Sequence, residues 1–131
     1  MNAPRFLSLN NVLEIHEDML ARHGGGMSGV FSIGLLESAV AMPHAAFGGQ
    51  YCHETIEAMA AAYLFHLCKN HPFFDGNKRT ALSAALAFLY SNRMTLEATD
   101  KELEDLCLKV AAGELSKDDV IAFMETHVRK G

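Results

Sequence analysis

The sequence predicts an all-α protein, a compact helical bundle that carries one short β-hairpin. Three observations support this fold class. Apolar residues recur at spacings of three and four along most of the chain. Residues that cap or stop helices lie at the ends of these segments. No repeat, linker or low-complexity tract interrupts them. The chain has 131 residues, a length typical of one domain, so residues 1–131 are interpreted as a single domain.

The first helix is predicted from an apolar stripe between Val12 and Leu20, with Ser8 or Asn10 as its cap. A run of glycines at 24–26 stops this helix. Residues 24–29 match the pattern GxGxxG, but a dinucleotide site needs that pattern after a strand. We therefore interpret the segment as a helix stop followed by a flexible loop.

The second helix is expected to begin at Ser32 and to end at Pro43. The residues after it, 45–52, place aromatic side chains around a glycine pair, a pattern that favours a two-residue hairpin. The hairpin is formed by Phe47, Gly48, Gly49, Gln50 and Tyr51.

Two apolar helices follow and are expected to form the centre of the bundle. The third runs from Ile56 to about Asn70, where Pro72 forces the preceding residue out of helical geometry. The fourth runs from about 77 to 92. Because almost all of 81–90 is apolar, we expect this helix to be buried on all sides.

Capping signals predict the last two helices. Thr99 and Glu102 have the spacing of a capping box, and Gly113 is a suitable residue just past the end of that helix. Ser116 opens the final helix, with acidic residues at 118–119 in its first turn.

Composition excludes several classes of function. Half of the residues are hydrophobic, which excludes a largely disordered chain. Acidic residues outnumber basic ones 16 to 11, a net charge of −5, so nucleic acid or anionic lipid is not expected to bind through bulk charge. No apolar run reaches the length of a membrane span and no leader is visible. The expected product is soluble and cytoplasmic.

Two common metal motifs are also excluded. His16 and His53 each begin an HExxH pattern, but neither has the second histidine that a zinc protease requires. The cysteines form no CxxC pair and are interpreted as reduced thiols. They are Cys52, Cys68 and Cys107.

The segment HPFFDGNKRT, residues 71–80, is the candidate site, because it joins the two central helices and holds charged groups of both signs. Its glycine precedes a helix N-terminus, whose free N–H groups bind phosphate, and Lys78 and Arg79 add positive charge there. Asp75 is a hard oxygen ligand suited to Mg²⁺. His71 can accept a proton near neutral pH. The segment therefore predicts a site for a nucleotide polyphosphate, a divalent cation and proton removal from a hydroxyl.

The alternative interpretation is a purely structural turn between two helices. In that case Pro72 ends one helix, Asp75 or Asn77 caps the next, and the two phenylalanines pack. Capping explains neither His71 nor the adjacent pair of cations, and this favours the functional interpretation.

These residues resemble the signature of the Fic/Doc superfamily, HPFx[DE]GN[GK]R, which the chain matches between His71 and Leu82. The stretch 34–39, Pro43 and the segment 88–92 are similar to the death-on-curing, or Doc, branch. The resemblance covers residues 10–125 and implies an all-α Fic fold with a hairpin flap beside the active loop.

The resemblance also implies roles for the residues of the site. His71 would be the general base, Asp75 would hold Mg²⁺, and Arg79 would pair with a phosphate of ATP. The anion hole would be formed by Gly76, Asn77 and Lys78. Phe73 would anchor the loop in the core, and the hairpin would align the target chain by main-chain pairing.

The chain differs from one or the other branch of the family in four places. Lys78 and Leu82 stand where adenylyl-transferring members have glycine and a second arginine, and these changes are typical of Doc. Glycine at position 76 is typical of Fic sequences, whereas phage-type Doc sequences have alanine at this position. Doc-like sequences also often carry Arg-Asp where this chain has Phe31 and Ser32.

The resemblance implies a toxin that phosphorylates a translation protein similar to elongation factor Tu, using ATP and Mg²⁺. Protein adenylylation and a non-catalytic protein-binding module stay open as alternatives. No glutamate is followed by glycine or asparagine, so the self-inhibitory motif of many Fic enzymes is not visible. We therefore expect a small antitoxin protein to inhibit the chain in trans.

Overall fold

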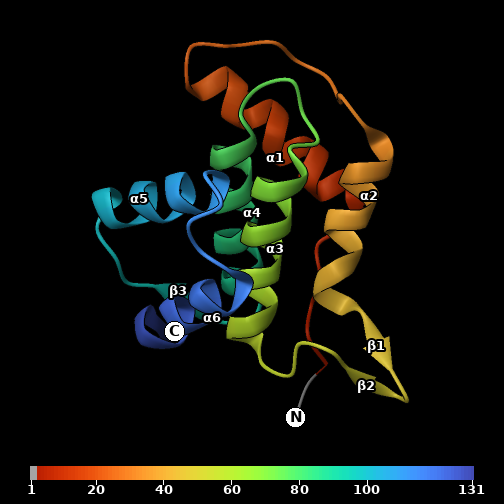
Figure 1. Ribbon diagram of the computed structural model, residues 1–131, viewed down its shortest axis with the longest axis vertical. Coiled ribbons are helices and arrows are strands. Elements are labelled where there is room, and N and C mark those ends of the chain that lie inside the picture. The colour runs from red at the N-terminus through yellow and green to blue at the C-terminus, as the bar shows by residue number, and fades with distance from the viewer. Residues whose placement is uncertain (1–2) are drawn as a thin grey trace.

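The structure is a computed structural model that describes residues 3–131. Figure 1 shows α3 and α4 side by side at the centre, with α1 crossing the top of the bundle, α2 on the right, and α5 and α6 on the left. The elements in chain order are α1 Leu9–Arg22, α2 Ile33–Ala41, the 3-10 turn η1 Met42–His44, β1 Ala46–Phe47, β2 Gln50–Tyr51, α3 Ile56–Asn70, α4 Asn77–Ser91, β3 Met94–Leu96, α5 Asp100–Ala111, α6 Lys117–His127 and β4 Val128–Lys130. The predicted helical fold is confirmed.

Local capping explains where the helices begin. Ser8, not Asn10, is the N-cap of α1, and its hydroxyl accepts from the Asn11 amide at 3.1 Å. Ser32 caps α2 in the same way, and the capping box of Thr99 with Glu102 opens α5. These side chains satisfy amide groups that a helix leaves without partners in its first turn.

The centre of the core is the interface between α3 and α4. Small side chains let the two backbones approach closely. The fully buried alanines are Ala60, Ala61 and Ala62 on α3 and Ala81, Ala84 and Ala85 on α4. α4 is nevertheless not buried on all sides, which corrects our expectation. One stripe along the helix, from Arg79 through Leu82 and Leu86 to Tyr90, is partly or fully exposed, and Tyr90 is 79% exposed.

The predicted hairpin is confirmed, and a second small sheet was not predicted. In the hairpin, Ala46 pairs with Tyr51 and Phe47 with Gln50. Both turn glycines have a positive φ, as a tight two-residue turn requires. The second sheet pairs β3 with β4, which joins the segment after α4 to the last described residues. None of the helices in the described range is long and apolar enough to cross a membrane.

Candidate active site

The candidate loop connects the end of α3 to the start of α4, at one end of the bundle (Figure 1). His71 follows α3 in the left-handed conformation, with φ 51°, and its side chain is exposed. A residue other than glycine pays about 1–2 kcal/mol for this conformation. Backbone strain of this kind is found most often at functional sites. Here the left-handed conformation places the His71 imidazole at the surface of the loop.

The side chain of Asn77 holds the loop in shape. Its Oδ1 accepts from the Phe73 amide at 2.9 Å, and its Nδ2 donates to the Phe73 carbonyl at 2.8 Å. Asn77 is only 4% exposed, and Phe73 is buried as a core anchor should be. With both polar atoms bonded to the main chain, the Asn77 side chain fixes the loop, and only its backbone N–H remains for an anion.

The start of α4 presents amide groups and two cations. Gly76 precedes the helix with φ 78°, and its carbonyl accepts a hydrogen bond from the Thr80 amide at 2.9 Å, which begins the helical pattern. Lys78 and Arg79 are exposed, and neither forms an ion pair within residues 3–131. A helix N-terminus with two unpaired cations is a favourable site for phosphate oxygens.

A small cavity lies against this helix end. Its volume is about 210 Å³, and Asp75, Gly76 and Arg79 line it from the candidate loop. Its other lining residues come from the end of α1 and the segment after it, and they are Met19, Leu20, His23, Gly25 and Gly26. The cavity therefore places the carboxylate of Asp75 and the guanidinium of Arg79 around one space.

Two contacts orient Asp75, and both come from the first third of the chain. His16, on α1, donates from Nε2 to the main-chain oxygen of Asp75 at 2.8 Å. The imidazole of His16 also stacks on the Phe73 ring, with centroids 3.8 Å apart. The amide of Met27 donates to Asp75 Oδ2 at 2.8 Å. The second carboxylate oxygen of Asp75 is thus left to bind a cation.

The segment after α1 is not a free loop, which corrects our expectation. Val30 forms an antiparallel bridge with Phe73, and the amides of Phe31 and Ser32 both donate to the Pro72 carbonyl, at 2.8 and 3.1 Å. The Phe31 ring meets Phe74 edge to face. Residues 24–32, defined here as the covering segment, therefore form one wall of the candidate site. The sequence signal that could have found it is the unusual density of glycines.

The structure does not place the β-hairpin beside the candidate loop. The hairpin precedes the first residue of α3 and the loop follows the last, so the 15 residues of α3 separate them. A helix of that length spans about 20 Å. Figure 1 shows the hairpin and the loop at opposite ends of the bundle. Our prediction that Phe47–Tyr51 lies next to the active loop is wrong, and the covering segment takes that position.

The residues present fit a magnesium–phosphate ligand. In the described part of the chain no group of three His, Cys, Asp or Glu side chains could hold a metal ion by itself. Mg²⁺ commonly binds one or two carboxylates and completes its shell with water and substrate phosphates. Asp75 offers one such carboxylate beside a helix end suited to phosphate, and this donor set agrees with Mg²⁺ bound together with a polyphosphate.

The fold and the site define a helical protein with a phosphate-binding loop between its two central helices. The sequence profile described as the Fic/DOC family matches residues 6–89. The chain is 41% identical to "Toxin Doc" of Mycolicibacterium smegmatis over 101 residues, which is 75% of this chain and 77% of that protein. It is 32% identical to "Protein kinase doc" of Escherichia phage P1 over 116 residues, 88% of this chain and 90% of that protein. This chain belongs to the Fic/Doc family, in its Doc-like branch.

Proposed function

We propose that this chain transfers the γ-phosphoryl group of Mg·ATP to a side-chain hydroxyl of a translation protein similar to elongation factor Tu. The observation that carries the proposal is the shared position of His71, Asp75 and the α4 N-terminus on one loop. The similarity to a phage protein named as a protein kinase supports the transferred group.

The residues of the loop would divide the reaction among them. His71 takes the proton of the target hydroxyl as its oxygen forms a bond to the γ-phosphorus, and the bond from that phosphorus to the bridging oxygen breaks to release ADP. Asp75 holds Mg²⁺, which neutralises charge on the phosphates. The backbone amides of Gly76, Asn77 and Lys78 bind phosphate oxygens, and Arg79 pairs with one of them.

Leu82 favours phosphoryl over adenylyl transfer. It lies one turn beyond Lys78 and packs partly buried against the core, so it adds no cation to the phosphate site. The binding of phosphate therefore depends on the charges of the first turn of α4. Adenylylation remains the alternative reaction, and a non-catalytic binding module would not need a strained histidine beside unpaired cations.

Labelled ATP tests the reaction. The purified chain is incubated with a translation-factor fraction, Mg²⁺ and ATP labelled in the γ or the α position. We expect label on protein only from γ-labelled ATP, and no label with His71→Ala. Label from α-labelled ATP would assign adenylyl transfer instead. An unchanged signal with a correctly folded His71→Ala variant would remove His71 from the role of base.

We also propose that the chain is the toxin of a toxin–antitoxin pair and that a small antitoxin inhibits it in trans. The name of the mycobacterial relative supports this. Expression should arrest growth in the cytoplasm of the host, and His71→Ala should abolish the arrest. Co-expression of the neighbouring open reading frame should restore growth. Failure of every neighbouring frame to restore growth would contradict the antitoxin, without affecting the assignment of the reaction.

A further inference from the structure

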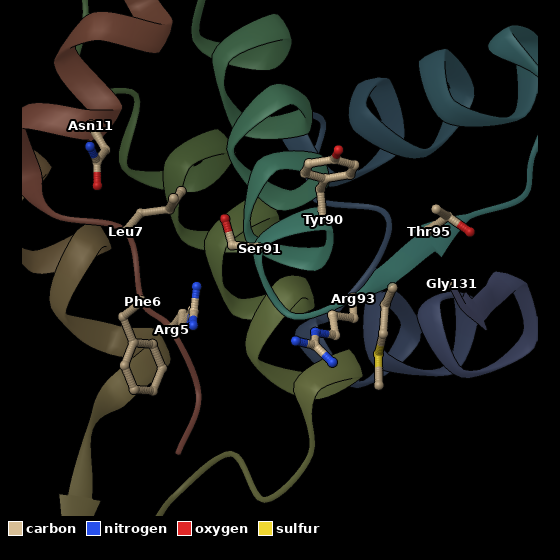
Figure 2. A pocket seen from close by; sticks show the side chains of 10 residues that line it. Arg5, Phe6, Leu7, Asn11, Tyr90, Ser91, Arg93, Thr95 and Gly131 are labelled. Atoms are coloured by element: carbon tan, nitrogen blue, oxygen red, sulfur yellow. The ribbon is translucent and has the colours of Figure 1, made fainter. Parts of the chain in front are cut away.

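A second and larger cavity lies at the other end of α4 from the candidate active site. Its volume is about 570 Å³. It is formed by the N-terminal segment Arg5–Leu7, the last residues of α4 and the start of β3 (Figure 2). The 15 residues of α4 separate this cavity from the candidate loop by about 20 Å. None of the residues assigned to phosphoryl transfer lines it.

Two arginines contribute positive charge to this cavity. Arg5 and Arg93 line it from opposite sides, and Figure 2 shows the Arg93 side chain extending toward the side where Arg5 lies. Within residues 3–131 neither forms an ion pair, and no acidic side chain lines the cavity. The chain as a whole carries an excess of acidic residues. Two unpaired guanidinium groups around one hollow therefore favour a ligand with two anionic groups.

Both arginines stand on ordered backbone. The Asn92 side chain accepts from the Arg5 amide at 2.8 Å and donates to the Arg5 carbonyl at 3.0 Å, and it also donates to the Phe88 carbonyl at 2.8 Å. Arg93 is the next residue and has φ 63°. Its main-chain carbonyl accepts a hydrogen bond from the Gly131 amide at 2.8 Å. The Asn92 side chain thus connects the N-terminal segment to the end of α4 and keeps the backbones of Arg5 and Arg93 beside the same cavity. Because these backbone segments are already fixed, less conformational entropy is lost when a ligand binds.

The remaining walls combine apolar side chains with the polar Asn11, Ser91 and Thr95. Phe6, Leu7 and Met94 contribute carbon surface, and the ring of Tyr90 stands almost fully exposed at the edge. We propose that this cavity binds an acidic segment of a protein partner, in which apolar side chains alternate with carboxylates. A protein is favoured over nucleic acid because the net charge of −5 repels a polyanion, and two cations match a pair of carboxylates.

Peptide binding tests this proposal on the full chain. The probe is a fluorescein-labelled peptide of about eight residues in which glutamate and leucine alternate. We expect binding that weakens with salt, and about tenfold lower affinity for each of Arg5→Gln and Arg93→Asn. Asparagine is chosen at 93 because it tolerates the left-handed conformation. Lys101→Gln, which removes an exposed cation of α5, is the matched control and should bind as wild type does.

The location is checked by amide chemical shifts in the presence of the same peptide. Shifts confined to residues 5–7 and 90–95, and retained in His71→Ala, would support a site separate from the catalytic loop whether or not the proposed reaction is correct. The proposal is overturned if the peptide does not bind, if the arginine variants bind it as wild type does, or if shifts appear at 71–79 instead. Stronger binding of a single-stranded oligonucleotide than of the peptide would assign the cavity to nucleic acid.

Discussion

The imidazole of His16 donates a hydrogen bond from Nε2 to the main-chain oxygen of Asp75 at 2.8 Å, across 59 positions of sequence. His16 is 1% exposed and stacks flat on Phe73. Asp75 is therefore positioned by a buried side chain of α1 at its carbonyl and by the Met27 amide at its carboxylate. His16 touches neither the proposed nucleotide nor the target, so it is a positioning residue.

The first prediction concerns this hydrogen bond. His16→Phe keeps the stacked ring but removes the donor, which leaves the Asp75 carbonyl unpaired at a cost of about 1–3 kcal/mol. We expect the Mg²⁺ concentration needed for half-maximal transfer to rise and the rate to fall about tenfold, or 1.4 kcal/mol in the barrier. His16→Gln, whose amide can donate, should recover part of the loss.

His44→Phe is the matched control, because His44 is exposed beside Phe6, away from the loop. It should leave the Mg²⁺ dependence unchanged. A His16→Phe variant that keeps both the wild-type rate and the wild-type Mg²⁺ dependence would contradict the positioning role.

The second prediction concerns the two bonds between Asn77 and the main chain of Phe73. Asn77→Ala removes both, so we expect the free energy of unfolding to fall by about 2 kcal/mol, at about 1 kcal/mol for each bond. Hydrogen exchange should localise the change, because the Phe73 amide loses its acceptor and its protection. Transfer activity should fall with it, since the loop no longer holds its shape.

Asn70→Ala provides the comparison. Its side chain makes one bond, from Nδ2 to the Leu35 carbonyl at 2.9 Å. That variant should lose about half as much stability and keep the protection of the Phe73 amide. Equal protection of that amide in wild type and Asn77→Ala would show that other contacts hold the loop.

Local signals in the sequence were enough for the helices and for the position of the loop. Ser8, Ser32 and Thr99 cap helices through atoms three residues away, so their effect is visible in any short window. His71, Asp75 and the first turn of α4 are also close together in the sequence, so their grouping at one site could be predicted in the same way. These features were predicted because the interacting groups are close in sequence.

Other features depend on contacts between distant segments. The sequence shows His16 as one member of an apolar stripe, and nothing near it points to Asp75. The hairpin was placed correctly along the chain but wrongly in space, because its position depends on the direction and length of α3. The pairing of β3 with β4 involves three residues on each side, too few for an alternating pattern to indicate.

The third prediction concerns the cysteines, all of which are free thiols in the described structure. Cys52 is exposed, whereas Cys68 and Cys107 are buried. Hydrogen bonding with Cys107 and burial raise the pKa of the Cys68 thiol, which further suppresses its thiolate. A thiol-specific disulfide reagent should therefore titrate Cys52 quickly in the native protein and all three cysteines after unfolding.

Cys52→Ser is the control and should abolish the fast phase while leaving the others unchanged. Rapid reaction of Cys68 or Cys107 in the folded Cys52→Ser variant would contradict the burial of these two thiols.

The last prediction is a loss of stability on acidification that depends on His66. Burial, the nearby Lys117 ammonium and His53 lower the pKa of His66 from 6.5 to about 4. Lys117 Nζ donates to His66 Nε2 at 3.3 Å, a bond that only the neutral imidazole accepts. The His66 imidazole binds a proton more tightly in the unfolded chain than in the folded chain. The stabilising contribution of neutral His66 to the free energy of unfolding is therefore fully present above pH 6.5 and is lost as the pH falls toward about 4.

Urea unfolding at several pH values measures this effect. Because His66 is only partly buried, solvent screening reduces the expected difference between neutral and acidic pH to about 1–2 kcal/mol. His66→Gln cannot titrate, so its stability should fall less between those pH values than that of wild type, whereas the exposed-site variant His44→Gln should follow wild type.

Lys117→Met removes both the repulsion and the donor, so the pKa of His66 in an NMR titration should rise toward its ordinary value. Parallel stability curves for wild type and His66→Gln would mean that groups other than His66 govern acid unfolding.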